Sequence, residues 1–459
     1  MDFKNMTREQ RRRYIKRKKR NRNIVIAILL LICVALIGGT VWGIGKITSK
    51  IAGGSASSSK VESEGPKEPQ VVAETVLSNS GDILIHSTVL NAAHKSGTEY
   101  NFKDMFKYVK EYLDECDLST VNAEFSIGTA EQYNSAEMVF RVPETVLDAL
   151  QYAGFDVATT ANNHTNDGGE SGFLRTVESL KAKNFTYTGT RADESEKKYK
   201  IVESNGIKIG MVNYTYGTFS SDGTKYLNGI PCSDATNSLV NVFSVNDLEK
   251  FYSEMEEIIA DMKSDGAETI TLYIHWGDEY YLEPNTYQTS IAQKMCDLGV
   301  DTIIGGHPHK VQPVELLTSE DGTHQTTCIY SMGNFLSNQV ISAMDDVMGN
   351  KLGHTEDGVI YKVHYKKFDD GTVKVSKLSV IPTWVYRYVR TDGLRDYYII
   401  PIEKSTYDTI GEKYNLDSAT AKNAQASYDR TMELVSVGIN DCNKALEKDI
   451  ETYIEENTK

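Results

Sequence analysis

Strand-like and helix-like segments alternate along most of this chain, and this alternation limits what it can fold into. Short apolar runs predict strands at residues 74–80, 117–121, 157–160, 207–213, 269–275 and 301–304. Apolar residues at helical spacing predict helices at residues 102–115, 144–153, 169–183, 245–263 and 286–298. The alternation implies an α/β sandwich with at least one sheet largely covered by helices.

Two further segments follow the alternating region. Strands at residues 359–368 and 373–381 flank the turn Asp369-Asp370-Gly371, which predicts a hairpin. Residues 407–459 have a helical and polar pattern, which leaves open whether this stretch packs on the domain or stays apart. About 300 residues of α/β pattern are enough to bury a large core, as one domain or as two fused halves.

Five of the nine histidines lie beside predicted strand ends, close to carboxylate, amide or glycine residues. They are His86, His164, His275, His307 and His309. Imidazole, carboxylate and amide groups are the ligands that borderline and hard divalent metals accept. Strand-to-loop junctions are also where the active sites of α/β folds usually lie. A buried metal centre is therefore the first hypothesis.

The segment Gly306-His307-Pro308-His309 gives this hypothesis its strongest support. Two imidazoles with a rigid proline between them can face one centre from a single turn. His275 comes from the end of another predicted strand. A single histidine is more often structural than a ligand, but three at neighbouring strand ends favour a metal or catalytic site.

Carboxylates and an amide extend the candidate site. Asp82 follows a predicted strand, although a helix cap or turn would explain it equally well. Glu124 ends an apolar strand, where an unpaired charge would be costly, so a metal partner is the more natural compensation. Asn163 and His164, with Asp167, can supply an amide ligand and a general acid/base held by a carboxylate. The alternative at that segment is an asparagine-rich turn.

Four aromatic residues near these segments are candidates for the rim of a substrate site, and ordinary core packing would explain each of them as well. They are Tyr214, Tyr216, Trp276 and Tyr280. The sequence contains neither a Gly-x-Ser-x-Gly nucleophile elbow nor a Gly-x-x-x-x-Gly-Lys phosphate loop.

The N-terminal segment predicts a membrane anchor. Residues 1–23 hold 11 Lys/Arg and 2 Asp/Glu, and an uncharged apolar run follows at residues 24–44. A run of about 21 residues can span a bilayer as a helix. The apolar core of a signal peptide has about 7–15 residues, so an anchor is favoured over a signal peptide cleaved near Gly54-Ser55-Ala56. The positive-inside rule then keeps the N-terminus cytoplasmic and the main domain outside the cell membrane.

The composition of residues 52–70, rich in Gly, Ser, Glu, Lys and Pro, is typical of a flexible stalk. We therefore divide the chain into a basic tail, an anchor, a stalk, a main domain and a mostly helical extension. Their predicted bounds are residues 1–23, 24–45, 46–72, 73–385 and 386–459.

Charge and cysteine content exclude some functions. The formal net charge is −15 and the basic tail contributes +9, so the rest of the chain carries −24. An acidic domain argues against nucleic acid as a partner, and the basic tail fits anionic lipid headgroups. The six cysteines show no close-pair spacing, which argues against a disulfide framework and a thiolate zinc site. Cys116, Cys296 and Cys328 are expected to fill the core.

Seven segments in this order resemble the bacterial poly-γ-glutamate capsule biosynthesis family, the CapA-like proteins. The resemblance covers roughly residues 75–385. Its segments are Gly81-Asp82-Ile83-Leu84, Asn122-Ala123-Glu124, Ala161-Asn162-Asn163-His164 with Asp167, Tyr214-Thr215-Tyr216-Gly217, His275-Trp276-Gly277-Asp278-Glu279-Tyr280, Gly306-His307-Pro308-His309 with Gln312-Pro313, and Tyr330-Ser331-Met332-Gly333-Asn334-Phe335.

This family is similar to the calcineurin-like metallophosphatases, whose fold is a two-sheet sandwich flanked by helices. The resemblance implies a set of ligands for one or two divalent ions (Zn²⁺, Mn²⁺ or Ca²⁺), namely Asp82, Glu124, Asn163, His275, His307 and His309. It also implies His164 as a proton donor, which we pair with Asp167 as the catalytic residues. The residues that we assign to substrate binding are Asn122, Tyr214, Tyr216, Trp276, Glu279 and Asn334.

The sequence departs from the metallophosphatase pattern in several places. His86 lies four residues after Asp82, where an Asp-x-His motif is usual. Asn122-Ala123-Glu124 stands where those enzymes have a bridging Asp beside Gly, and many relatives have Leu in place of Ala123. Residues 220–236 also lengthen the loop after Gly217. The sequence is therefore compatible with a site for a single ion and with a binuclear site of altered geometry.

Two functions remain open. The first is a metal-dependent hydrolase or transferase that acts on an amide or a phosphoester in the cell envelope. The second is a non-catalytic membrane component that helps a synthase make or export poly-γ-glutamate or a related anionic polymer. The expected partners are membrane lipid and either that polymer or its synthase complex. The acidic domain would repel a polyanion unless cations or a local basic patch intervene.

Overall fold

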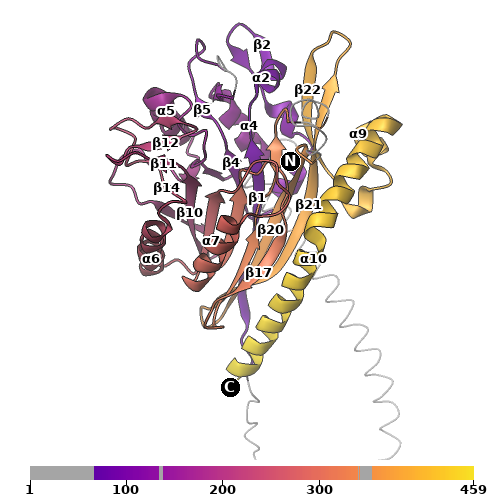
Figure 1. The fold of residues 1–459 in the computed structure, drawn as a ribbon. Helices are drawn as coiled ribbons and strands as arrows, with labels where there is room; N and C mark the ends of the chain where they lie inside the picture. Colours follow the sequence, from indigo (N-terminus) through magenta and orange to yellow (C-terminus); the bar gives the residue numbers. More distant parts are fainter. Residues whose placement is uncertain (1–66, 134–137, 340, 342–353, 459) are drawn as a thin grey trace, which may run out of the picture. The chain divides into compact units, whose positions relative to one another are not determined.

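Two β-sheets stack face to face within residues 69–456, and helices cover their outer faces (Figure 1). The structure is a computed structural model that describes residues 67–133, 138–339, 341 and 354–458. The predicted α/β class with two sheets and flanking helices is confirmed for these residues. The basic tail and the anchor at residues 24–45 lie outside them, and no helix in the described part is both long and apolar enough to cross a bilayer.

The first sheet has eight strands, four of which run parallel to one another in the order β1, β4, β7 and β8. They comprise Val71–Ile83, Leu118–Ala123, Val157–Thr159 and Thr186–Thr188. On the other side of β1 the sheet continues antiparallel through β20, β21 and β22, while β19 pairs with the end of β1. These strands comprise Asp357–Phe368, Val373–Val389, Arg395–Pro401 and Asn334–Leu336.

The second sheet has seven strands in the order β14, β10, β15, β16, β18 and β17, with β9 beside β10. Its parallel centre comprises Val242–Phe243, Ile207–Tyr216, Thr269–His275, Thr302–Gly306 and Gln325–Ile329. The antiparallel strands β17 and β9 comprise Val314–Thr318 and Tyr199–Ser204.

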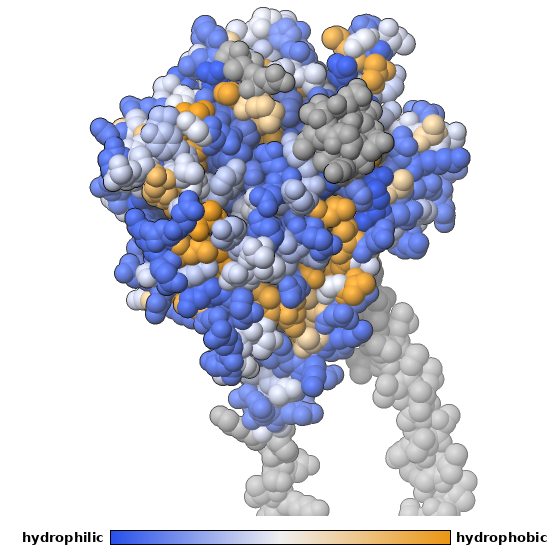
Figure 2. Space-filling view, in the orientation of Figure 1, coloured by the Kyte–Doolittle hydropathy of each residue, from blue (hydrophilic) through white to orange (hydrophobic). Residues whose placement is uncertain are grey.

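Apolar side chains fill three layers between these elements. Helices α2, α4 and α5 cover the first sheet, and α6 and α7 cover the second. They comprise Ser87–Ala93, Thr145–Ala153, Gly169–Ala182, Leu248–Ser264 and Thr286–Asp297. The middle layer joins the inner faces of the two sheets, with Leu77 and Leu118 on one side and Ile209 and Tyr273 on the other. The face seen in Figure 2 is accordingly mostly hydrophilic, with small separate hydrophobic patches.

Short elements complete the described chain. The strands β2, β3, β5, β6, β11, β12 and β13 comprise His94–Ser96, Glu99–Tyr100, Ser126–Ile127, Arg141–Val142, Thr218–Phe219, Lys225–Leu227 and Ile230–Pro231. The helices η2, α3, η3, α9 and α10 comprise Lys103–Phe106, Lys110–Asp114, Lys404–Thr406, Ile410–Tyr414 and Ser418–Asn457. Cys116, Cys296 and Cys328 are buried, as expected, and so are Cys232 and Cys442; none of the five forms a disulfide within the described residues.

Three predicted boundaries differ from the structure. The continuous helix predicted at residues 102–115 is divided into η2 and α3, although Phe102, Phe106 and Leu113 still form one buried face. The predicted domain boundary at residue 385 lies inside β21, and the sheet continues through β22, so the helical extension begins only after Pro401. Strand β1 begins at Val71, two residues before the predicted start of the main domain at residue 73.

The C-terminal helix α10 packs on the domain, which answers the question that its polar pattern left open. Val435, Ile439 and Leu446 lie in the middle core layer. Gly438 lies so close to β17 that a Cβ atom there would be 1.9 Å from the backbone oxygen of Val314. The helix approaches β17 so closely because residue 438 has no side chain.

We expect Gly438→Ala to destabilise the protein by about 1–3 kcal/mol, because the added methyl group overpacks the contact with Val314. The sign of the stability change shows whether the helix is docked, because in an undocked helix the same substitution would stabilise the protein by about 1 kcal/mol. Chemical denaturation of both proteins measures the difference. Val437→Ala at the neighbouring position, which is 67% exposed, is the control and should change stability by less than about 0.5 kcal/mol. A more stable Gly438→Ala protein would contradict the docked helix.

Candidate metal centre

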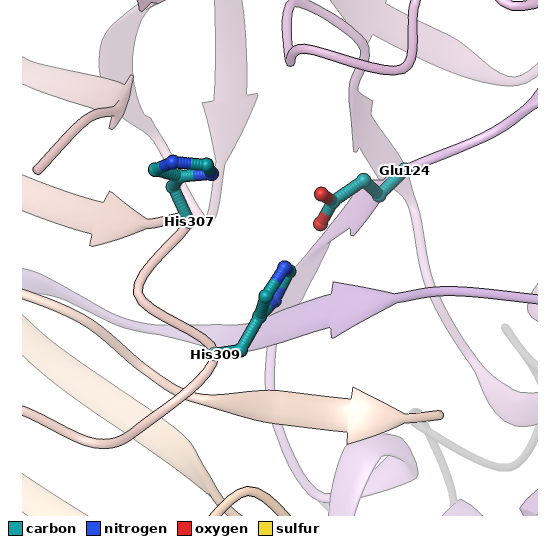
Figure 3. A group of neighbouring side chains, drawn as sticks. All are labelled: Glu124, His307 and His309. Atoms are coloured by element: carbon teal, nitrogen blue, oxygen red, sulfur yellow. The ribbon is translucent and has the colours of Figure 1, made fainter. Parts of the chain in front are cut away.

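Carboxylate and imidazole groups from both sheets meet where the parallel strands end. Asp82 lies at the end of β1, Glu124 follows β4, His275 ends β15, and His307 and His309 follow β16. They form two overlapping groups, Asp82–Glu124–His275 and Glu124–His307–His309, and within each group the potential ligand atoms lie within 4.8 Å of one another. Figure 3 shows the two imidazoles of the second group beside the Glu124 carboxylate. Glu124 belongs to both groups.

An unusual backbone turn aims the two histidines. His307 and His309 both have positive backbone φ angles, 98° and 56°, which residues other than glycine rarely adopt. The backbone N–H of His307 donates to Asp82 Oδ2 at 3.1 Å. Gly306 makes this approach possible, because a Cβ atom there would lie 2.8 Å from Asp82 Oδ1. The turn therefore connects the second sheet to the carboxylate at the end of β1.

Two buried polar atoms in this cluster lack a hydrogen-bond partner among the described residues. They are Glu124 Oε1 and His307 Nδ1. Unsatisfied buried polar atoms are costly and rare in proteins, and a cation between the two groups would satisfy both. Two carboxylates and three imidazoles also form a donor set typical of divalent transition metals. The cluster therefore fits a metal ion.

Charges within the cluster set the protonation of its members. Burial would raise the pKa of Asp82, but a hydrogen bond with His309 and the charges on His275 and His309 hold it below its ordinary value. Burial would lower the pKa of His309, yet the contacts with Asp82 and Glu124 raise it to about 9. Burial and the neighbouring histidines hold the pKa of His307 well below its ordinary value. His307 is therefore neutral at neutral pH and has a lone pair to offer.

Two asparagines that were predicted to bind substrate contact the candidate ligands. Asn122 Nδ2 donates to Asp82 Oδ1 at 2.8 Å and to Glu124 Oε2 at 3.3 Å. Asn334 Oδ1 lies 3.1 Å from His309 Nδ1, and Asn334 is fully buried. Partners of this kind fix the orientation of metal ligands. Asn122 and Asn334 therefore orient candidate ligands, and their substrate-binding role stays a prediction.

His164 and Asp167 form the predicted pair. His164 Nδ1 lies 2.8 Å from Asp167 Oδ2, and His164 Nε2 lies 4.0 Å from Glu124 Oε1. A proton on Nδ1 shared with the carboxylate leaves Nε2 facing the cluster. Asn163, a predicted ligand, places its Oδ1 2.9 Å from His275 Nε2. These five residues are all buried, so the pair and the amide belong to the interior of the site.

Two of the predicted rim aromatics belong to the core. Tyr214 packs on Phe251 of α6, with ring centroids 5.1 Å apart, and Trp276 Nε1 donates to the backbone oxygen of Tyr330 at 2.9 Å. Tyr214 pairs with Ile274 across β10 and β15, so both point to the helix-covered face, whereas the next pair, Thr215 and His275, points to the other face. Tyr214 and Trp276 are therefore core residues, and their predicted place at the rim was wrong.

The remaining rim residues lie beside the histidines. The Tyr216 ring is 4.7 Å from His307 and the Tyr280 ring is 6.0 Å from His309. Burial, followed by the charge on Glu279, raises the pKa of both tyrosines. Glu279 is half-buried, so its carboxylate borders the cluster from the accessible side. Tyr216, Tyr280 and Glu279 are therefore the groups that a substrate would meet first.

The sequence reasoning missed Asn228, at the tip of the hairpin between β12 and β13. Its Oδ1 accepts from Asn163 Nδ2 at 3.0 Å, and its Nδ2 lies 3.4 Å from both ring nitrogens of His164. Asn228 itself is exposed, so it connects the buried Asn163 and His164 side chains with the protein surface. The one sequence signal was the Asn-Gly turn inside the lengthened loop, which predicts a hairpin but not its contacts.

His86, the fifth histidine beside a strand end, has a structural environment. Its Nδ1 accepts from the backbone N–H of Asn338 at 3.2 Å, and its ring lies 4.9 Å from that of Phe140. Burial lowers the pKa of His86 to about 4. It therefore remains neutral and belongs to neither ligand group.

Comparison with known proteins identifies the family. A model of the bacterial capsule synthesis protein family PGA_cap matches residues 76–339, which is more than half of the chain. The chain belongs to this family. The capsule biosynthesis protein CapA of Bacillus anthracis is 26% identical over 374 residues, 80% of this chain and 77% of the relative. The PGA biosynthesis protein CapA of Bacillus subtilis (strain 168) is 25% identical over 325 residues, 70% of this chain and 75% of the relative. The matched PGA_cap region contains both ligand groups and the His164–Asp167 pair.

We expect the purified full-length protein to contain a bound divalent ion. A His307→Ala/His309→Ala variant should hold at least about tenfold less, because two of the three side chains in one ligand group are lost. Elemental analysis measures the content. His94→Ala, at an exposed histidine in β2, is the control and should keep the metal. Wild-type protein without metal, and without a thermal shift on adding Zn²⁺, Mn²⁺ or Ca²⁺, would contradict the assignment.

Proposed function

We propose that this protein is a metal-dependent enzyme of the cell envelope that acts on poly-γ-glutamate, or a related anionic polymer, during its synthesis, export or processing. The names of the two CapA relatives support the polymer. The observation on which the enzymatic part depends is the His164–Asp167 pair, whose free nitrogen faces the shared Glu124 carboxylate.

The residues that would hold the ion are Asp82, Glu124, His275, His307 and His309, with the Asn163 oxygen beside them. Three imidazoles in the donor set favour Zn²⁺ or Mn²⁺ over Ca²⁺, which takes mainly oxygen ligands. A bound divalent ion supplies Lewis-acid polarisation of a carbonyl or phosphoryl oxygen and lowers the pKa of bound water.

Side chains around the cluster would transfer the proton and shape the site. Asp167 accepts from His164 Nδ1 and thereby holds the imidazole with Nε2 toward the cluster, where it can give a proton to a leaving amine or take one up. Tyr216 and Tyr280 border the cluster beside His307 and His309 and would shield the site from bulk solvent. The exposed Asn228 would hold the buried His164 imidazole in place.

A non-catalytic role in a polymer synthase complex is the second candidate, and the burial of the cluster favours it. Asp82 and Glu124 are fully buried, and His309 is 1% exposed. Structural metal sites are closed in this way, whereas catalytic sites keep an open position. The same side chains would then fix the two sheets together and leave catalysis to a partner.

The location of the protein is part of the proposal. A basic tail followed by about 21 apolar residues supports a single-pass anchor with the main domain outside. Membrane lipid and the polymer or its synthase complex are the partners that this arrangement would bring together.

We expect the full-length protein to stay in the membrane fraction after an alkaline carbonate wash, because an apolar helix holds it in the bilayer. A variant that lacks residues 1–50 should appear in the soluble extracellular or supernatant fraction when it is expressed behind an unrelated signal peptide. Immunoblotting of the two fractions measures this. Release of the full-length protein by the wash, or a mature N-terminus near Ser57, would overturn the anchor.

His164→Gln should lower the rate of polymer turnover by about 10²–10⁴-fold, because a positioned proton-transfer group is lost. Its folding and metal content should stay nearly unchanged, whereas Asp82→Ala should lose metal as well as activity. The measurements are hydrolysis of γ-linked oligoglutamate by the purified full-length protein and polymer production in cells.

His324→Gln is the matched control for His164→Gln, since His324 is half-buried and contacts the backbone oxygen of Val300, which precedes β16 and belongs to neither ligand group. It should leave both readouts unchanged. Normal polymer levels in cells with the His164 variant, together with no turnover by the wild-type protein, would reject the enzyme and leave the accessory role.

A further inference from the structure

A separate cavity of about 470 Å³ lies between β11, β12, β14 and the start of α6. This volume is in the range of sites for small ligands. None of the candidate metal ligands lines it. Its lining combines three lysines with the aromatic rings of Phe219, Phe243 and Phe251.

The positive charge in this cavity is only partly compensated. Lys198 pairs with Glu254. Lys225 Nζ donates to the backbone oxygen of Val240 at 2.7 Å, and Lys250 Nζ lies 5.8 Å from the centre of the Phe219 ring. Neither Lys225 nor Lys250 forms an ion pair with any residue that the structure describes.

The half-buried Lys225 is the more informative of the two. Burial, together with the nearby Lys198 and Arg191, lowers its pKa to about 8 despite the opposing charge of Glu254. An anion in the cavity would favour the charged form of this lysine. The exposed Asp247 carboxylate also lines the cavity, so a ligand would have to place its charge toward Lys225 and Lys250.

The cavity and the metal cluster share one segment of the chain, residues 216–228. Tyr216 contacts His307, and Thr218 two residues later lines the cavity. Lys225 lines the cavity, and Asn228 three residues later contacts His164. In an extended strand three residues span about 10 Å. The cavity and the cluster are therefore only a few residues apart along this segment.

We propose that this cavity binds a γ-linked glutamyl residue of the polymer, with its α-carboxylate toward Lys225 and Lys250 and its two methylene groups against the aromatic rings. The proposal rests on the proposed function and names the part of the substrate that is held beside the metal cluster. The lysines of the cavity would also supply the local positive charge that a polyanion needs in order to approach a chain that carries −24 outside its basic tail.

The test is binding of a γ-linked pentaglutamate to the purified full-length protein, measured by calorimetry as a function of salt. Lys225→Met/Lys250→Met should weaken binding by about tenfold or more, since charge-assisted hydrogen bonds are lost, and should flatten the salt dependence. Metal content should not change, because neither lysine contacts a ligand group. Lys422→Met, at an exposed lysine of α10, is the control and should bind like wild type.

The outcomes separate this proposal from the proposed function. Equal binding by the wild type and the double variant would overturn the cavity site and leave the function standing. Lysine-dependent binding of single glutamate as tight as that of the pentamer would overturn the polymer assignment and indicate a small-molecule site. A wild-type protein that binds no γ-linked pentaglutamate would overturn both.

Discussion

The structure depends on the contact between Asp82 and the turn that follows β16. Asp82 ends a central strand of the first sheet, and the turn belongs to the second sheet, so their hydrogen bonds join the two layers at the functional edge. A fully buried carboxylate is stable only when it is paired. Asn122, the His307 backbone and the His309 imidazole provide these partners. The contacts that join the two sheets at this edge are therefore the same ones that hold the candidate ligands together.

The sequence was sufficient to predict the cluster because its members follow apolar strands directly. Parallel strands bring their carboxyl ends to one edge, so Asp82 and Glu124, at the ends of the neighbouring strands β1 and β4, were expected to lie close together. His275 ends a strand of the second sheet, so its approach to them depends on how the two sheets stack. Side-chain direction was harder to predict. Tyr214 lies in a family motif, yet it points to the helix-covered face. Asn228 is 64 residues from His164 in sequence, and nothing local indicates that contact.

A series of contacts links the C-terminal helix to the candidate metal centre. Arg430 of α10 donates two hydrogen bonds, at 2.8 and 2.7 Å, to Asp357 at the start of β20. The segment before this strand supplies the Thr355 backbone oxygen, which accepts from Asn334 Nδ2, and Asn334 in turn orients His309. The polar pattern of residues 407–459 could not reveal this link, because a helix that docks through a few apolar and charged residues resembles an exposed one.

Electrostatics then decides how such a domain can handle an anionic polymer. A chain that carries −24 outside its basic tail repels a polyanion over most of its surface, so attraction must come from local positive charge. A metal ion held by Glu124 and the histidines would be one such centre, and the ammonium groups of Lys225 and Lys250 are a second. Because both lie along residues 216–228, the polymer would be attracted there and repelled elsewhere. Repulsion by the rest of the domain would therefore restrict where the polymer binds.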